Sequence, residues 1–157
     1  MPFGYIVSPA TAGNTTTNSS ANTESDFLTI KPGTRDFRLV ALYVIGKAAA
    51  LTAISGIAIR LARFSTASTS GTSATPQPKD DLAPAAKQAA ATGSVSAGSG
   101  RTNGLVIGCG VAGPGGWVAR DDNQKYCLSG GGSDSIDAIS ISATASLNFE
   151  FSAETEE

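Results

Sequence analysis

The motif with the most recognisable spacing is a run of glycines that follows an apolar segment. Residues 105–113 read LVIGCGVAG and place Gly108, Gly110 and Gly113 in a G-x-G-x-x-G pattern. In dinucleotide-binding folds this pattern ends a strand and opens a helix whose N-terminus holds the pyrophosphate. Here the sequence PGGW follows at once, at residues 114–117, and it cannot propagate a helix. We therefore expect a glycine-rich bend between strands.

Acidic residues in two neighbouring segments could offer oxygen ligands to a metal ion. Asp121 and Asp122 lie in the first segment, and Asp134 and Asp137 lie in the second, which reads GGGSDSID over residues 130–137. Glycine–aspartate turns resembling this one bind calcium, and they usually occur as repeats. Because this chain has a single copy, we expect an ordinary turn and predict no metal site.

Histidine, the commonest general base and metal ligand, is absent from the sequence. The spacing of the two cysteines, Cys109 and Cys127, matches no zinc pattern, and they could form one disulfide or be two buried thiols. Residues 1–10 lack the basic region and long apolar run of a secretion signal, which favours buried thiols. We predict no catalytic residues, no cofactor and no enzymatic activity.

Four aromatic side chains could form a surface that stacks on a sugar or contacts a protein. They are Phe3, Tyr5, Trp117 and Tyr126. Trp117 is the only tryptophan of the chain, and a single tryptophan among small residues more often belongs to the core.

The net charge and the hydropathy pattern predict neither a nucleic-acid partner nor a membrane partner. The formal net charge is −2, and no basic stripe is present. Residues 39–59 are long enough to span a bilayer, but Lys47 interrupts them, and Gly46 and Gly56 weaken a helix. The β-prone pattern on both sides favours strands instead.

The clearest secondary-structure pattern is an alternation near the C-terminus. From Ile139 to Phe151 every odd position is apolar, whereas every even position from Ser140 to Ser152 is polar. A period of two predicts a strand or a hairpin with one face on a core and the other in water. Further strands are predicted at residues 27–30, 36–45, 57–64, 105–107, 117–120 and 126–129.

The remaining segments are predicted as loops and one helix. Residues 80–91 (DDLAPAAKQAAA) favour a short helix with an aspartate near its start and Pro84 in its first turn. Residues 65–79 and 92–103 are rich in serine, glycine and threonine and predict loops. The expected fold class is mainly β, an antiparallel β-sandwich or jelly-roll-like fold with one short helix and long loops.

The N-terminal 30 residues are predicted to form an arm that contacts a partner. Phe3, Tyr5, Ile6 and Val7 provide an apolar anchor, and a polar tract of threonine, asparagine and serine follows at residues 11–25. Residues 31–157 are expected to form a single β-sandwich-like domain, and the glutamates at the C-terminus to form a solvated tail.

The order of parts over residues 36–152 resembles a known family. A strand ends at Gly46-Lys47, an arginine-bearing strand covers residues 57–64, and a threonine- and proline-containing loop precedes the sequence LAPAA at residues 82–86. An alanine-rich run then reaches Gly93, and an amphipathic β segment ends the chain. This layout is similar to that of the small structural proteins of tailed-bacteriophage heads, including capsid decoration (cement) proteins.

The resemblance implies a non-enzymatic virion protein that is assembled in the host cytoplasm and binds the capsid exterior. There it would stabilise the shell by bridging subunits of the major capsid protein, as a homo-oligomer, either a trimer or a dimer. The alternative is a carbohydrate- or receptor-binding β-sandwich module of a fibre or surface protein, which would use Trp117 and neighbouring aromatic side chains.

Overall fold

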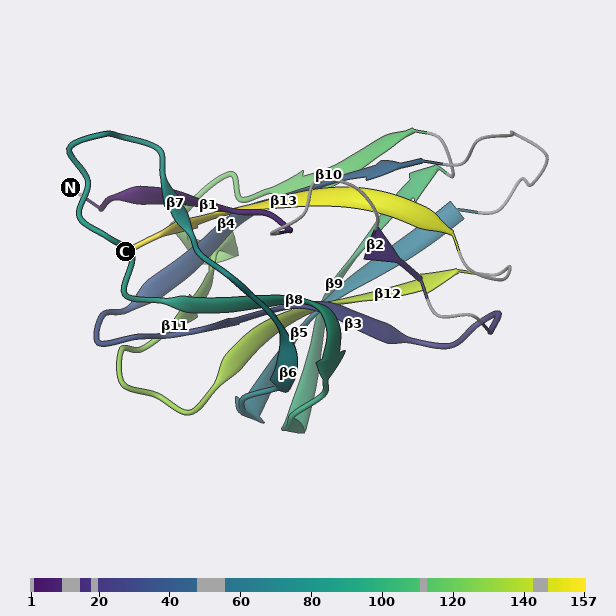
Figure 1. Ribbon diagram of the computed structural model, residues 1–157, viewed down its shortest axis with the longest axis horizontal. Helices are drawn as coiled ribbons and strands as arrows, with labels where there is room; N and C mark the ends of the chain where they lie inside the picture. The colour runs from purple at the N-terminus through teal and green to yellow at the C-terminus, as the bar shows by residue number, and fades with distance from the viewer. Residues whose placement is uncertain (1, 10–14, 18–19, 48–55, 111–112, 143–146) are drawn as a thin grey trace.

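The computed structural model describes residues 2–9, 15–17, 20–47, 56–110, 113–142 and 147–157. In this part of the chain, antiparallel strands form two sheets that pack face to face (Figure 1). The predicted class, mainly antiparallel β in a sandwich, is confirmed, whereas the jelly-roll variant is not.

The first sheet has seven strands in the described residues. They are β1 (Gly4–Val7), β2 (Thr15–Thr16), β4 (Phe37–Gly46), β7 (Gln77–Pro78), β10 (Pro114–Val118), β11 (Tyr126–Leu128) and β13 (Asn148–Glu156). Their order is β10–β4–β13–β1–β7, with β11 also beside β4 and β2 beside β13.

The second sheet has six strands within the part of the chain that the structure describes. They are β3 (Ser25–Lys31), β5 (Gly56–Thr66), β6 (Thr69–Ala74), β8 (Ala89–Ser96), β9 (Ser99–Gly110) and β12 (Ser135–Ser142). Their order is β6–β8–β3–β12–β5–β9. One short 3-10 helix, η1 (Asp122–Gln124), precedes β11.

The main core lies between the two sheets and contains the large apolar side chains of both. Phe27 on β3 of the second sheet packs edge-on against Phe149 and Phe151 on β13 of the first, with ring centroids 4.9 and 4.8 Å apart. All three side chains are buried. Edge-to-face pairs add to the free energy gained from area burial, so this aromatic cluster joins the sheets.

The predicted C-terminal alternation spans two strands that belong to different sheets, so it is neither one strand nor a hairpin. In β13 the odd positions Phe149 and Phe151 are buried, as predicted, and Ala153 continues the pattern beyond the predicted range. In β12, however, the main core receives Ile136 and Ala138, and Ile139 packs on the opposite face. The expectation of one face on a core and the other in water fails in β12, because both of its faces are covered.

The helix predicted at residues 80–91 is wrong. Asp80 closes a single turn, in which its carbonyl oxygen accepts the Ala83 N–H at 2.9 Å. The Glu157 carboxylate then accepts the Lys87 N–H at 2.8 Å, and β8 begins at Ala89 and pairs with β3 and β6. Alanine has the highest helix propensity, but propensity is a weak determinant, and sheet pairing decides the conformation here.

The polar segments expected as loops contribute strands. Residues 65–79 contain β6 and β7, and residues 92–103 contain the end of β8 and the start of β9. The side chains of β6 are exposed up to Ser73, so its backbone pairing with β8 holds it in the sheet.

The N-terminal 30 residues supply strands to both sheets. β1 lies between β13 and β7, and β3 lies between β8 and β12, so the expected domain boundary after residue 30 falls inside β3. Residues 10–14 and 18–19 of the polar tract lie outside the described residues. Both chain ends lie at the same end of the sandwich (Figure 1), where Phe3 and Glu157 exchange backbone hydrogen bonds.

The C-terminal glutamates, expected as a solvated tail, instead form part of β13 and its continuation. Glu150, Glu154 and Glu156 pair with Lys47, Lys79 and Lys125 at 3.0, 2.9 and 2.9 Å. Surface ion pairs of this kind contribute little each, so β13 is held in place mainly by its backbone pairing with β1 and β4.

Within the described residues, no helix has the length and apolar character needed to cross a membrane. The weakly charged stretch at residues 39–59 contributes to β4 and β5, and its middle, residues 48–55, lies outside the described residues.

Candidate functional site

The edge strands β9 and β10 of the two sheets lie beside each other, and glycine permits their close approach. A Cβ atom on Gly115 would overlap the Gly108 carbonyl oxygen and lie 2.5 Å from the Cys109 Cβ. β9 ends at Gly110 and β10 begins at Pro114, so Gly108 and Gly110 lie in a strand and the next element is a strand, as expected, and not a helix. Residues 111–112, between the two strands, lie outside the described residues.

A groove of about 560 Å³ lies where β9, β10 and β11 meet. Trp117 and Tyr126 line it with their rings nearly perpendicular, at 82°, and their centroids 5.6 Å apart. Of the four aromatic side chains considered from the sequence as a surface, the structure therefore brings Trp117 and Tyr126 together. Tyr5, on β1, and Phe3, beside it, lie on the other side of β4 and β13.

The groove is built from backbone as well as side-chain contacts. The Tyr126 hydroxyl accepts the Leu105 N–H at 2.7 Å, and a Cβ on the adjacent Gly104 would overlap that hydroxyl. Across the groove, the Gln124 side-chain oxygen accepts the Arg120 N–H at 3.1 Å. Arginine and glutamine offer donors beside an aromatic wall, which is a chemistry suited to polar ligands.

Exposed large apolar side chains lie around the same edge of the sandwich. On the outer face of the first sheet, Ile45 is 55% exposed, Tyr43 41% and Val118 50%. The register pairs Ile45 with Pro114 and Tyr43 with Gly116, so these residues share one face. We call Tyr43, Ile45, Pro114 and Val118 the β4–β10 face. On β9, Leu105 and Val106 are also exposed.

The four residues predicted to contact a partner differ in their accessibility. Tyr5 and Val7 are fully buried in the chain's own fold, and the Tyr5 hydroxyl donates to the Pro84 carbonyl oxygen at 3.0 Å. Phe3 is exposed and Ile6 is half-buried. Contact of this segment with a partner stays a prediction, and Phe3 and Ile6 are the side chains that a partner could reach.

The two cysteines are free thiols in different environments. Cys109 is buried, as predicted, and burial raises the pKa of its thiol, although a backbone hydrogen bond to Ile57 opposes this. Cys127 is exposed, so the expectation of two buried thiols is wrong for this residue. Its side chain shares the outward side of β11 and β4 with Arg38, its exposed register partner.

The four aspartates considered as calcium ligands serve separate structural roles. Asp121 caps η1 by accepting the Asn123 N–H at 2.9 Å, and Asp122 pairs with Lys125 at 2.8 Å. Asp134 pairs with an arginine of β5, and Asp137 is buried in β12. No group of three or more potential metal ligands occurs among the described residues.

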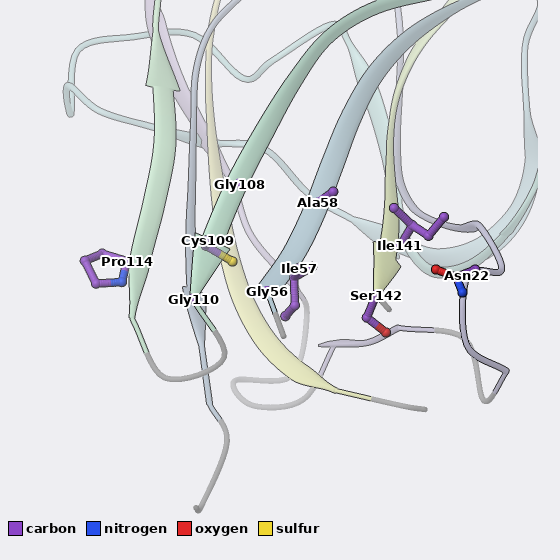
Figure 2. A pocket seen from close by; sticks show the side chains of 10 residues that line it. All are labelled: Asn22, Gly56, Ile57, Ala58, Gly108, Cys109, Gly110, Pro114, Ile141 and Ser142. Atoms are coloured by element: carbon purple, nitrogen blue, oxygen red, sulfur yellow. The ribbon is translucent and has the colours of Figure 1, made fainter. Parts of the chain in front are cut away.

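A second hollow, of about 580 Å³, lies where the first residues of β5 meet the ends of β9 and β12 (Figure 2). Ile57 and Cys109 project from neighbouring strands, and Asn22 and Ser142 mark its polar side. Its described lining offers the Cys109 thiol as the one titratable side chain, and that thiol is held in its neutral form by burial. This lining suits packing better than catalysis.

The comparisons with known proteins return no relative. No family model matches the chain, and no significant match appears among the curated proteins or the solved structures.

Sequence reasoning missed the partners of Trp117 in the groove. Leu105, Arg120 and Gln124 carry no motif that marks them, and they converge only because β9 and β10 approach closely. One feature of the sequence could have predicted the position of Gln124. Asp121 caps a short turn that ends at Gln124, and Tyr126 begins β11 two residues later, so Gln124 must lie close to Tyr126.

Proposed function

We propose that this chain is a non-enzymatic structural protein of a virion, which decorates a phage capsid and stabilises it by bridging major capsid protein subunits. The observation that carries the proposal is the β4–β10 face, where Tyr43, Ile45 and Val118 are each at least 41% exposed. Exposed apolar side chains that gather on one face mark interaction surfaces, and contact with a capsid subunit would cover them.

The position of this face at the sandwich edge supports the same role. β10 is the last strand of its sheet and β9 the last strand of the other, and in the described part of the chain no strand is hydrogen-bonded to the outer edge of either. Such edges offer backbone donors and acceptors to another chain. A homo-oligomer, dimer or trimer, would present several such faces and so could bridge several subunits on the virion exterior.

Binding to decoration-free capsids tests the proposal. Capsids of the phage whose genome encodes the chain, stripped of their decoration, are mixed with purified protein and sedimented. We expect saturable cosedimentation of the wild type. Ile45→Lys should weaken it by more than about tenfold, because a charge replaces an apolar contact. The register partner of Ile45 is Glu150, so a lysine is compatible with the fold.

The matched control is Leu82→Lys, which changes an apolar residue that is 88% exposed in a turn away from the β4–β10 face. It should bind as the wild type does. A wild-type chain that fails to cosediment refutes the capsid role, and equal loss in both variants refutes the assignment of the face.

A second candidate, carbohydrate binding, is favoured by the Trp117 groove. Trp117 and Tyr126 offer aromatic surface, and Arg120 and Gln124 offer polar groups at its rim. Because Trp117 is the only tryptophan, its fluorescence reports directly on this groove. Saturable quenching by an oligosaccharide, abolished in Arg120→Ala, would support this candidate, and an unchanged spectrum across a sugar panel would reject it.

A further inference from the structure

The second sheet is curled, because two very short connections join strands that are far apart in its order. β5 is followed by β6 after residues 67–68, although they are fifth and first in the order. β8 is likewise followed by β9 after residues 97–98, although they are second and sixth. The sheet can satisfy both connections only if its two sides meet at this end. We call the two connections the crossovers.

A fully buried carboxyl group holds the first crossover against the sheet. Asp137 on β12 accepts hydrogen bonds from Thr29 Oγ1 at 2.8 Å and Ser135 Oγ at 2.7 Å, and also from the hydroxyl of Ser68. Asp137, Ser135 and Ser68 are 0% exposed. These three partners are neutral hydroxyls from three different segments.

The second crossover is fixed through the first. Ser68 Oγ accepts the Gly98 N–H at 2.8 Å, and the Ser68 N–H donates to Ser135 Oγ at 3.3 Å. A Cβ on Gly98 would overlap the Thr66 carbonyl oxygen, so the crossovers lie directly against each other. A chain of hydrogen bonds thus runs from Asp137 through Ser68 to Gly98.

A second carboxyl group lies on the same face of the sheet. Asp26 on β3 pairs in register with Ile139, two positions along β12 from Asp137. Its Oδ2 atom is buried and has no hydrogen-bond partner among the described residues. Desolvation, and then the charge of Asp137, raise the pKa of Asp26 to about 6. Burial also raises the pKa of Asp137, although its three hydroxyl donors and Lys31 oppose this.

Other charged side chains near Asp26 and Asp137 form ion pairs of their own. Glu24 pairs with Arg60 on β5 and Arg101 on β9, at 2.8 and 2.6 Å. The charge of Arg101 lowers the pKa of Asp26, whereas that of Glu24 raises it. Arg63 of β5 pairs with Asp134. β6 and β8 contain no charged residue.

We propose that Asp26 and Asp137 form a proton-controlled clasp, which fixes the two crossovers to the sheet while the pair holds a proton and loosens them when both carboxyls are ionised. Two adjacent carboxylates in a desolvated site repel each other, and the repulsion falls on the crossovers because Asp137 binds Ser68.

The direction of the pH dependence follows from proton linkage. Because the pKa of Asp26 is raised in the folded chain from 3.8 to about 6, the folded state binds more protons than the unfolded state. The stabilisation is complete below about pH 4 and is lost as the pH rises through about 6. Between pH 5 and 7.5 this predicts a rise of roughly tenfold in the opening equilibrium constant.

Hydrogen exchange of the Ser68 and Gly98 amides tests the clasp, with rates corrected for the intrinsic effect of pH. In the wild type, protection of both amides should fall by roughly tenfold between pH 5 and 7.5. In Asp26→Asn the protection of both amides should stay high at pH 5 and at pH 7.5. Asp81→Asn, an exposed aspartate in a turn, is the matched control and should behave as the wild type.

Two further measurements test the hydrogen bond to Ser68 and the titration of Asp26 separately. In Ser68→Ala the Gly98 amide should exchange fast at both pH values, because its acceptor is lost. The carboxyl carbon of Asp26, followed by NMR, should titrate with a midpoint near 6. Wild-type protection that does not change between pH 5 and 7.5, or an equal fall in Asp26→Asn, would overturn the proposal.

Discussion

Replacement of Gly115 by alanine tests the close approach of β9 and β10. The new Cβ would overlap a backbone carbonyl oxygen and lie 2.5 Å from the Cys109 Cβ, so strands rather than a flexible side chain must move. Overpacking of this kind costs about 1–3 kcal/mol, and alanine returns about 0.4–1 kcal/mol by restricting the unfolded chain. We therefore expect a net loss of about 1–2 kcal/mol.

Gly108→Ala provides the matched control, since a Cβ there would meet no atom within 4 Å. It should be neutral or stabilise the chain by a few tenths of a kcal/mol. Urea denaturation monitored by Trp117 fluorescence measures both variants, and Gly115→Ala should also change the native emission because the groove widens. Equal stability of the two variants, with equal emission, would refute the reasoning.

Three further predictions concern the core, the groove and the pair of carboxyls formed by Asp26 and Asp137. Phe27→Ala should lower the free energy of unfolding by about 3–5 kcal/mol, because it removes both edge-on aromatic contacts between the sheets; a change below about 1 kcal/mol in urea denaturation would contradict the packing described. Tyr126→Phe should cost about 0.5–1.5 kcal/mol and speed exchange of the Leu105 amide, which loses its acceptor; unchanged exchange would contradict this. The wild-type free energy of unfolding should fall by about 1.4 kcal/mol from pH 5 to 7.5, and this fall should be absent in Asp26→Asn; a stability that rises over this interval would reverse the assigned sign.

Strands with large β-prone side chains could be predicted from the sequence. The runs that became β4 and β5 carry apolar residues such as Leu39, Val44 and Ile59 at core positions, and burial selects them. The strands β6 and β8 could not be predicted, because their residues are mostly alanine, serine, threonine and glycine. Their conformation depends on backbone pairing with each other and with β3, which no local pattern encodes.

Tertiary structure also decides which side chains of β12 face the main core, and it decides where the carboxyls of Asp26 and Asp137 lie. Ile139 fits the sequence alternation but packs with Ala62 and Phe64 on the face opposite the main core. That face is covered because the sheet curls, and the crossovers that cause the curl consist of small residues without a strong signal. The groove could be anticipated only in part, from the presence of Trp117 and Tyr126.

Cryo-electron microscopy of virus particles, purified from the natural source of this chain, tests the proposed capsid role most directly. We predict density for the two-sheet sandwich on the outside of the capsid, with Tyr43, Ile45 and Val118 against the major capsid protein. Particles that lack the chain, or that carry it with the β4–β10 face turned to solvent, would contradict the proposed function.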